Sequence, residues 1–252
     1  MTTPTVAGVR WERAGPVATI TLCRPEALNA QTPATWLALR DIGRELPGDI
    51  RVVVLRGEGR AFSAGLDLTA AGAIVSELAG LDPTDAEARV AGFQEGFAWL
   101  RRPDLVSVAA VHGHAIGAGF QLALACDLRI LADDAQFSMA EVRHGLVPDL
   151  TGTRRLVELV GYSRALEICA TGRRLGAAEA DRIGLATLVV PAAELDDAVR
   201  DLTAAVLAGP RDAVVEIKAL LSGALTRTPA EQEARERAAQ VRRLRDLAGL
   251  GE

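Results

Sequence analysis

The sequence has no excess of positive charge. Its 28 lysines and arginines are outnumbered by 33 aspartates and glutamates, which leaves a net charge of −5. This balance excludes a broad basic face for nucleic acid, so we expect no nucleic-acid partner. An anionic ligand must be held by local features and not by the overall field.

Long apolar runs are also missing. No run approaches the ~20 residues of a membrane-spanning helix, and the first fifteen residues carry no apolar stretch typical of a signal peptide. We therefore expect no membrane anchor and no membrane partner.

Cysteine is scarce and its spacing is uninformative. Cys23, Cys126 and Cys169 are far apart and form no CxxC pair, and an odd number argues against a disulfide framework. We expect free, buried thiols in a reducing compartment and therefore a cytoplasmic protein, with no metal site.

Short apolar strands alternate with helical stretches in the first part of the chain. Residues 17–22 alternate and are β-branched, which predicts a strand. Residues 52–55 are wholly apolar, which indicates burial on both faces. We also expect strands at 106–111 and 128–131, and helices at 29–45, 87–101, 118–126, 152–160 and 163–170, the first with Thr32 as N-cap before Pro33. The alternation predicts an α/β fold with parallel pairing.

The character of the chain changes near residue 191. Residues 194–208 and 211–222 are predicted to be amphipathic helices, and 229–247 a charged one. This tail has too few apolar positions for a core of its own, so we divide the chain into 1–190 and 191–252. Residues 70–96 are rich in Ala and Gly, and we expect a loop-and-helix excursion there.

Two glycine-rich turns each follow an apolar strand and open a helix: GEGRAFSAGLDL (57–68) and GHAIGAGFQLALACD (113–127). Such turns leave backbone N–H groups unpaired. Aimed at one point, two of them would supply a pair of donors for a developing oxyanion. A dinucleotide fingerprint, GxGxxG, fails in both turns: Phe62 stands at the third glycine position of the first, and the second has the spacing GxxxGxG. Ser63 in AFSAG is a poor nucleophile elbow, and close packing of helix on strand remains the structural alternative.

The sequence resembles the crotonase, or enoyl-CoA hydratase/isomerase, superfamily over nearly its whole length. The matching segments, in order, are TLCRPEALNA (21–30), GRAFSAGLDL (59–68), GAGFQLALACDLRI (117–130), AQFSMAEVRHGLVPDLTGTRRL (135–156) and the helical tail. The resemblance implies a crotonase-like spiral of ββα units with a C-terminal helical oligomerisation region, and a homotrimer or hexamer. It also implies an acyl-CoA substrate and no separate cofactor, because coenzyme A enters as part of the substrate.

The resemblance also implies roles for particular residues. The backbone N–H groups of Leu66 and Ala118 would form the oxyanion hole for the thioester oxygen; Ala118 stands where many members have glycine. Hydratases of the family use two glutamates, whose positions match Gln121 and Glu141. An amide cannot act as a general base, so Glu141 is the expected base, unless it is simply a surface carboxylate.

A second departure is Asp149, where hydratases typically have glycine. An acid there resembles dienoyl-CoA isomerases, but Asp149 could equally cap the helix expected at Gly152. Gln121 could likewise do no more than satisfy buried backbone groups. We interpret His112 and His114 as satisfied buried or rim histidines, and Asp67 as a residue that fixes its turn.

The nucleotide end of coenzyme A is expected over the first turn. Arg24 and Arg60 would meet phosphates, unless they are solvated surface side chains. The backbone of Ala27, Leu28 and Ala64 would line the path of the pantetheine and adenine. Lys218 in the tail could reach the coenzyme A of a neighbouring subunit.

Three functions follow from these residues. The first is isomerisation of an enoyl-CoA by proton transfer through Glu141. The second is hydration of a 2-enoyl-CoA to a 3-hydroxyacyl-CoA, with Gln121 helping to hold water. The third is acyl-CoA binding without catalysis.

Overall fold

The computed structural model describes residues 4–251 and contains two β-sheets. The larger sheet has the strand order β1-β2-β3-β4-β6-β9. Its strands are β1 (Val9–Ala14), β2 (Val17–Leu22), β3 (Val52–Gly57), β4 (Val106–Val111), β6 (Leu128–Ala132) and β9 (Leu188–Val190). All neighbours pair in parallel except β1, which forms an antiparallel hairpin with β2. The expected parallel pairing is therefore confirmed for five of the six strands.

A smaller sheet lies at one end of the larger one. It consists of β5 (His114–Ile116), β7 (Gln136–Ser138) and β8 (Leu175–Gly176), in the order β5-β7-β8. The chain passes from β4 into β5 within three residues, and from β6 into β7 within four. These two successive turns of the chain each contribute one strand to each sheet, as in a ββα unit.

The helices connect these strands and cover the sheets. They are α1 (Pro33–Glu45), α2 (Leu68–Ala79), α3 (Pro83–Ala98), α4 (Ala118–Ala125), α5 (Gly152–Val160), α6 (Tyr162–Thr171), α7 (Ala177–Arg182), α8 (Leu195–Ala208), α9 (Arg211–Gly223) and α10 (Pro229–Leu247). Short 3-10 turns are η1 (Pro25–Ala27), η2 (Trp99–Arg101), η3 (Ala140–His144) and η4 (Ala192–Glu194). None of these helices combines the length and the apolar character needed to cross a bilayer.

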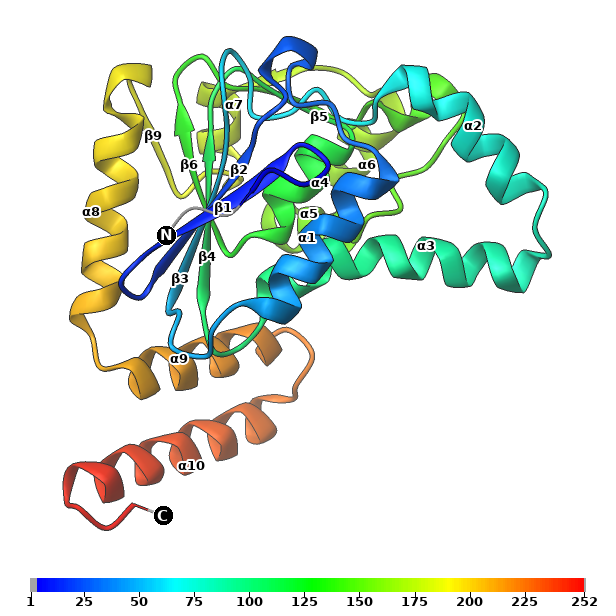
Figure 1. Ribbon diagram of the computed structural model, residues 1–252. Coiled ribbons are helices and arrows are strands. Elements are labelled where there is room, and N and C mark those ends of the chain that lie inside the picture. Colours follow the sequence, from blue (N-terminus) through cyan, green and yellow to red (C-terminus); the bar gives the residue numbers. More distant parts are fainter. Residues whose placement is uncertain (1–3, 252) are drawn as a thin grey trace.

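The larger sheet is buried on both faces, as the apolar run at 52–55 predicts. Val53 and Leu55 contribute to a core with Trp36 of α1 and Phe97 of α3. Val52 and its neighbours on the other face pack against α8. Figure 1 shows α8 on one side of the sheet and α1 and α4 on the other. Burial on two faces explains why the central strands lack polar alternation.

The excursion expected at 70–96 consists of two helices. Asp82 caps α3, accepting from the Thr84 N–H at 3.0 Å, and Pro83 is its first residue. Helix α2 has no buried residue, and α2 and the start of α3 project away from the sheets in Figure 1.

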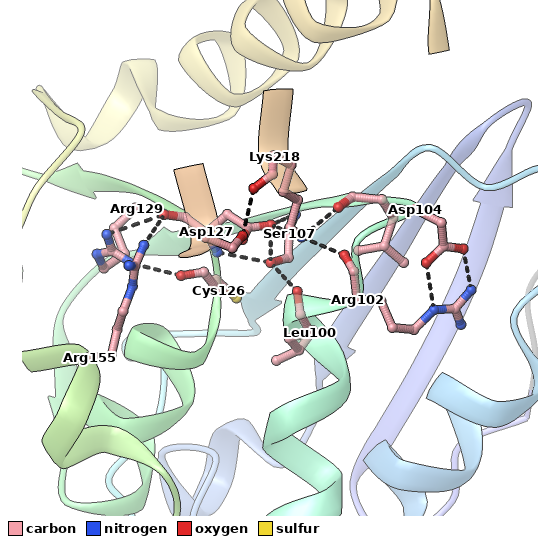
Figure 2. A network of polar contacts seen from close by, with 11 residues as sticks. Leu100, Arg102, Asp104, Ser107, Cys126, Asp127, Arg129, Arg155 and Lys218 are labelled. Carbon is pink, nitrogen blue, oxygen red and sulfur yellow. Dashed lines mark hydrogen bonds and ion pairs between the residues drawn. The ribbon is translucent and has the colours of Figure 1, made fainter. Parts of the chain in front are cut away.

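The tail forms the three expected helices, and α9 is fixed to the body through one lysine. Lys218 donates to Asp127 Oδ2 at 2.7 Å and to the carbonyls of Arg102 and Leu105 at 2.6 and 2.7 Å. Asp127 Oδ2 also accepts from the N–H of Ser107 at 2.8 Å. Figure 2 shows this network between α9 and the sheet. Helix α10 packs on α9, away from the sheets (Figure 1).

Candidate functional site

The two glycine-rich turns lie side by side. The Ser63 N–H donates to the His114 carbonyl at 2.8 Å, and the Ile116 N–H donates to the Ser63 carbonyl at 3.0 Å, as in a short parallel pairing. An added Cβ on Gly119 would lie 2.6 Å from the Ser63 carbonyl oxygen, so only glycine permits this close approach. Residues more than 50 positions apart in the sequence, such as Ser63 and His114, are thereby brought into one site.

The two predicted donors meet where the turns touch. Gly65 has φ +87°, and a Cβ built on it would lie 3.5 Å from the Ala118 nitrogen. Ala118 is the first residue of α4, so its N–H lacks an intrahelical acceptor. Neither the Leu66 nor the Ala118 N–H donates to any atom of residues 4–251. Two neighbouring N–H groups are therefore free to bind one acceptor.

Glu141 lies beside the second turn. It follows β7 in the first turn of η3 and is half-buried. Its Oε1 accepts from Gln121 Nε2 at 2.7 Å, whereas Oε2 is buried and has no partner within residues 4–251. A Cβ on Gly117 would lie 3.4 Å from Oε1 and 3.9 Å from Oε2. The carboxylate thus contacts the residue that immediately precedes the Ala118 N–H, and the alternative of a surface carboxylate is wrong.

Burial dominates the protonation behaviour of this carboxylate. Desolvation raises the pKa of Glu141, while the hydrogen bond from Gln121 opposes that rise and the charge of Asp149 adds to it. Partial desolvation also raises the pKa of Asp149, although the residue lies at the surface. A raised pKa suits a carboxyl group that takes up and returns a proton near neutral pH.

The side chain of Gln121 is completely buried. Its Oε1 accepts from the N–H groups of Leu150 at 2.8 Å and Gly152 at 3.3 Å. It thus satisfies buried backbone groups, as expected, but the alternative that it does no more is wrong, because its Nε2 also donates to Glu141. The resemblance implied that Gln121 and Glu141 share one site, but it did not predict a direct hydrogen bond between their side chains.

Asp149 does not cap α5, so that alternative is wrong. The N-cap of α5 is Thr151, with φ 68° and no side-chain hydrogen bond. The Asp149 carbonyl accepts from Gln94 Nε2 of α3 at 2.7 Å. The carboxyl of Asp149 lies close enough to Glu141 to raise the pKa of Glu141. A catalytic role for Asp149 therefore stays a prediction.

The first turn is fixed by side chains that the sequence analysis only partly identified. Asp67 caps α2, accepting from the Thr69 N–H at 3.1 Å, and pairs with Arg24 at 3.0 Å. Its predicted structural role is confirmed. Buried Asn29 was missed: it has φ 56°, and its amide donates to the carbonyls of Glu58 and Ala61, both at 2.8 Å. An asparagine in a loop, with its tolerance of positive φ, was the available signal.

The residues expected along the coenzyme A path surround this turn. Arg24 also donates to the Ala30 carbonyl at 3.0 Å, so its guanidinium is already engaged within the protein. Arg60 is exposed and forms no hydrogen bond or ion pair with residues 4–251. Ala27, Leu28 and Ala64 are half-buried, and the Ala64 N–H donates to the Leu28 carbonyl at 2.8 Å. The Ala64–Leu28 contact joins the two segments of the expected path, and the predicted roles of the five residues stay predictions.

Several other candidates have structural partners. The Ser63 hydroxyl is buried and donates to the Asn29 carbonyl at 2.8 Å, which excludes a free nucleophile. His112 Nε2 contacts the Gly59 carbonyl at 2.9 Å, as expected, but His114 Nδ1 is buried without a partner in the described chain. The ammonium of Lys218 is held in the network of Figure 2, so its predicted reach toward a neighbouring subunit is wrong.

Other polar groupings lie away from Glu141. Within residues 4–251, no three His, Cys, Asp or Glu side chains are grouped so as to hold a metal ion. A cavity of about 500 Å³ lies at the ends of β1–β3, with Arg10, Arg56 and His112 among its lining residues. Glu141 is not among its lining residues.

Comparison with known proteins agrees with this geometry. Residues 12–245 match the family model described as enoyl-CoA hydratase/isomerase. A probable enoyl-CoA hydratase, echA8, of Mycobacterium tuberculosis is 37% identical over 197 residues, which cover 77% of this chain and 72% of the relative. A carnitinyl-CoA dehydratase of Escherichia coli is 39% identical over 193 residues, covering 75% and 70%.

Solved structures give the same result. This chain is similar to a putative enoyl-CoA hydratase from Thermobifida fusca crystallised with acetoacetyl-CoA. The TM-score is 0.92, with 50% identity over 95% of this chain and 96% of that one. A second structure of the Thermobifida protein, with CoA, has a TM-score of 0.90 and 49% identity, covering 96% and 95%. The chain therefore belongs to the enoyl-CoA hydratase/isomerase family of enzymes, and its α/β architecture confirms the crotonase fold.

Proposed function

We propose that the protein moves a proton next to the thioester of an acyl-CoA, and that its reaction is double-bond isomerisation of an enoyl-CoA with Glu141 as base. One observation carries this proposal. Oε2 of Glu141 is buried, unpartnered within residues 4–251 and close to the backbone that carries the Ala118 N–H. A buried carboxylate oxygen without a partner lowers stability. We infer that this oxygen is left free to accept a proton from a C–H group of the substrate.

The proposed reaction begins at C2 of the substrate. The thioester oxygen would accept from the N–H groups of Leu66 and Ala118, and Glu141 would remove a proton from C2. The negative charge then moves onto the thioester oxygen, where each preorganised donor lowers the barrier by roughly 3 kcal/mol in comparable sites. Protonation at C4 completes the shift of the double bond. Either Glu141 gives back the proton that it took, or a protonated Asp149 gives its own proton to C4, and the proton on Glu141 then passes through solvent to restore Asp149.

An acyl-CoA is the inferred substrate because the related Thermobifida fusca protein was crystallised with acetoacetyl-CoA and with CoA. Arg60 follows the first turn's opening glycines and has no side-chain partner within residues 4–251, and we propose it for a phosphate of coenzyme A. Arg24 would contribute only if it left Asp67. Ala27, Leu28 and Ala64 remain the proposed backbone path, and no separate cofactor is proposed.

Hydration of a 2-enoyl-CoA is the second candidate, favoured by the names of the relatives. In that reaction Glu141 would have to activate water alone. Gln121 is completely buried and its oxygen is occupied by two backbone N–H groups, so it offers water no general base. This favours isomerisation over hydration. Acyl-CoA binding without turnover stays the third alternative.

A homotrimer or hexamer is proposed through the C-terminal helices. Large apolar side chains are exposed on α9, α10 and the segments after them: Ile217, Leu221, Leu225, Val241, Leu244, Leu247 and Leu250. A patch of this kind is typical of a protein–protein interface. The cytoplasmic location stays a prediction from the sequence.

Product analysis by NMR in D2O tests the proposal, with a 3-enoyl-CoA and a 2-enoyl-CoA offered separately. We expect double-bond migration with deuterium entering at C2 or C4, and loss of both in Glu141→Gln. Formation of 3-hydroxyacyl-CoA from the 2-enoyl substrate without migration would establish the hydratase. Tight binding of both substrates with no turnover would establish the binding protein.

A further inference from the structure

The amide of Gln121 connects two parts of the site. Its Nε2 donates to Oε1 of Glu141 at 2.7 Å, and its Oε1 accepts from the N–H groups of Leu150 at 2.8 Å and Gly152 at 3.3 Å. The orientation of the amide is unambiguous, because a backbone N–H can only donate and must therefore face the amide oxygen. The nitrogen is left to face the carboxylate.

The start of α5 leaves space for this amide. A Cβ on Gly152 would lie 2.8 Å from Cγ and 3.1 Å from Oε1 of Gln121, so the missing side chain of Gly152 leaves the room that the amide occupies. Gly152 is also the first residue of α5, whose N-cap Thr151 forms no side-chain hydrogen bond. The oxygen of Gln121, reaching across from α4, takes the place of the missing cap.

We propose that Gln121 is a positioning residue that holds the Glu141 carboxylate and the 149–152 turn in one fixed arrangement. Because Oε1 of Glu141 is occupied by the amide, Oε2 is the oxygen left for proton transfer. The same amide also fixes the backbone that follows Asp149. The inference rests on the proposed function only for the identity of Glu141 as the base; the arrangement itself is independent of any substrate.

The amide also affects the protonation of Glu141. Burial raises the pKa of Glu141, and the hydrogen bond from Gln121 lowers it. The backbone of Glu141 itself also lowers the pKa of this carboxyl by hydrogen bonding, Asp149 raises it, and His144 lowers it. The thiol of Cys169 on α6 is also near: burial, and then the charge of Glu141, raise the pKa of Cys169. Removal of the amide should therefore remove one effect that lowers the pKa of Glu141, so that this pKa rises further.

The test is a carbon-13 NMR titration of the full chain, labelled at the side-chain carboxyl carbon of glutamate and containing no substrate. Comparison with Glu141→Gln assigns the Glu141 signal. We expect the Glu141 midpoint to move to higher pH in Gln121→Met, which keeps the length of the side chain and removes its polar atoms. In Gln121→Glu we expect two coupled midpoints, because two carboxyl groups at this distance share a proton.

Gln31→Met is the matched control. Gln31 is equally buried and has two side-chain partners, Ser63 Oγ at 2.9 Å and Trp36 Nε1 at 2.8 Å, but it does not touch Glu141. Its replacement should leave the Glu141 midpoint where it is. A midpoint that stays unchanged in folded Gln121→Met would overturn the proposal.

A measurement on the unmodified protein decides the matter even where Gln121→Met does not fold. The side-chain amide protons of Gln121 should shift with pH at the same midpoint as the Glu141 carboxyl carbon. An amide signal that is insensitive to this titration would refute the contact. If Glu141→Gln instead keeps full turnover, the proposed function fails, while the titration still decides the role of Gln121.

Discussion

Replacement of Lys218 by methionine should detach α9 from the body of the protein. Only 10% of the Lys218 side chain and 20% of the Asp127 side chain are exposed. Methionine has a similar length and no charge, so packing along the stem is largely kept. The variant therefore isolates the polar contacts of Figure 2.

The expected loss can be added up from those contacts. The two backbone carbonyls, of Arg102 and Leu105, each lose a hydrogen bond worth about 1 kcal/mol. Asp127 loses a charged partner worth about 2 kcal/mol and keeps only its bonds to Ser107. The sum, about 4 kcal/mol, agrees with the 3–5 kcal/mol typical of breaking a buried ion pair.

Urea unfolding at one fixed protein concentration measures this loss. The matched control is Arg200→Met, which removes an exposed ion pair with Asp197 on α8 and should cost about 0.5 kcal/mol or less. A loss below about 1 kcal/mol in Lys218→Met would refute the reasoning, because it would mean that water replaces all three contacts without cost.

Two further predictions concern the site. Gly117→Ala places a Cβ against Glu141 at φ +51°, ψ −119°, so it should lower the free energy of unfolding by about 1–3 kcal/mol and also reduce turnover. The control Gly15→Ala also has a positive φ, +58°, but has nothing within 4 Å of the added Cβ, so its turnover should be unchanged. Equal turnover in both variants would contradict the assignment of Glu141 to the site. Glu141→Gln should raise Tm at pH 7, because a carboxyl with a raised pKa stabilises the folded state below its ordinary pKa and loses that contribution as pH rises through the folded value. The gain should shrink toward pH 4, and a Tm at pH 7 equal to or below that of the unmodified protein would be evidence against a buried, ionised Glu141.

The regular elements were largely predictable from local patterns. Residues 17–22 and 106–111 form strands with the expected bounds, and α10 begins and ends as expected, at 229 and 247. These segments carry strong signals: alternating or continuous apolarity in the strands, and Thr228 with Glu231 as a capping box before α10. Strand β1 was missed because VRWERA mixes charged and apolar residues at the edge of the sheet.

The site was predictable only in part. The resemblance placed Glu141 and the two donor turns, and their adjacency follows from the parallel contact at Ser63. The contact of Gln121 with the turn at Leu150 joins residues 29 positions apart on different elements, and no periodic pattern reports such a contact. The anchoring of Lys218 by Asp127 likewise depends on where α9 lies in space.

Exchange of the C2 protons of a saturated acyl-CoA with D2O tests the central claim most directly, because it needs neither isomerisation nor hydration. We predict that the unmodified protein exchanges these protons and that Glu141→Gln slows the exchange by about 10²- to 10⁴-fold, the usual contribution of a general base. Glu45→Gln, at the exposed end of α1, should exchange at the unmodified rate. Exchange at the unmodified rate in Glu141→Gln would contradict the assignment of Glu141 as the base.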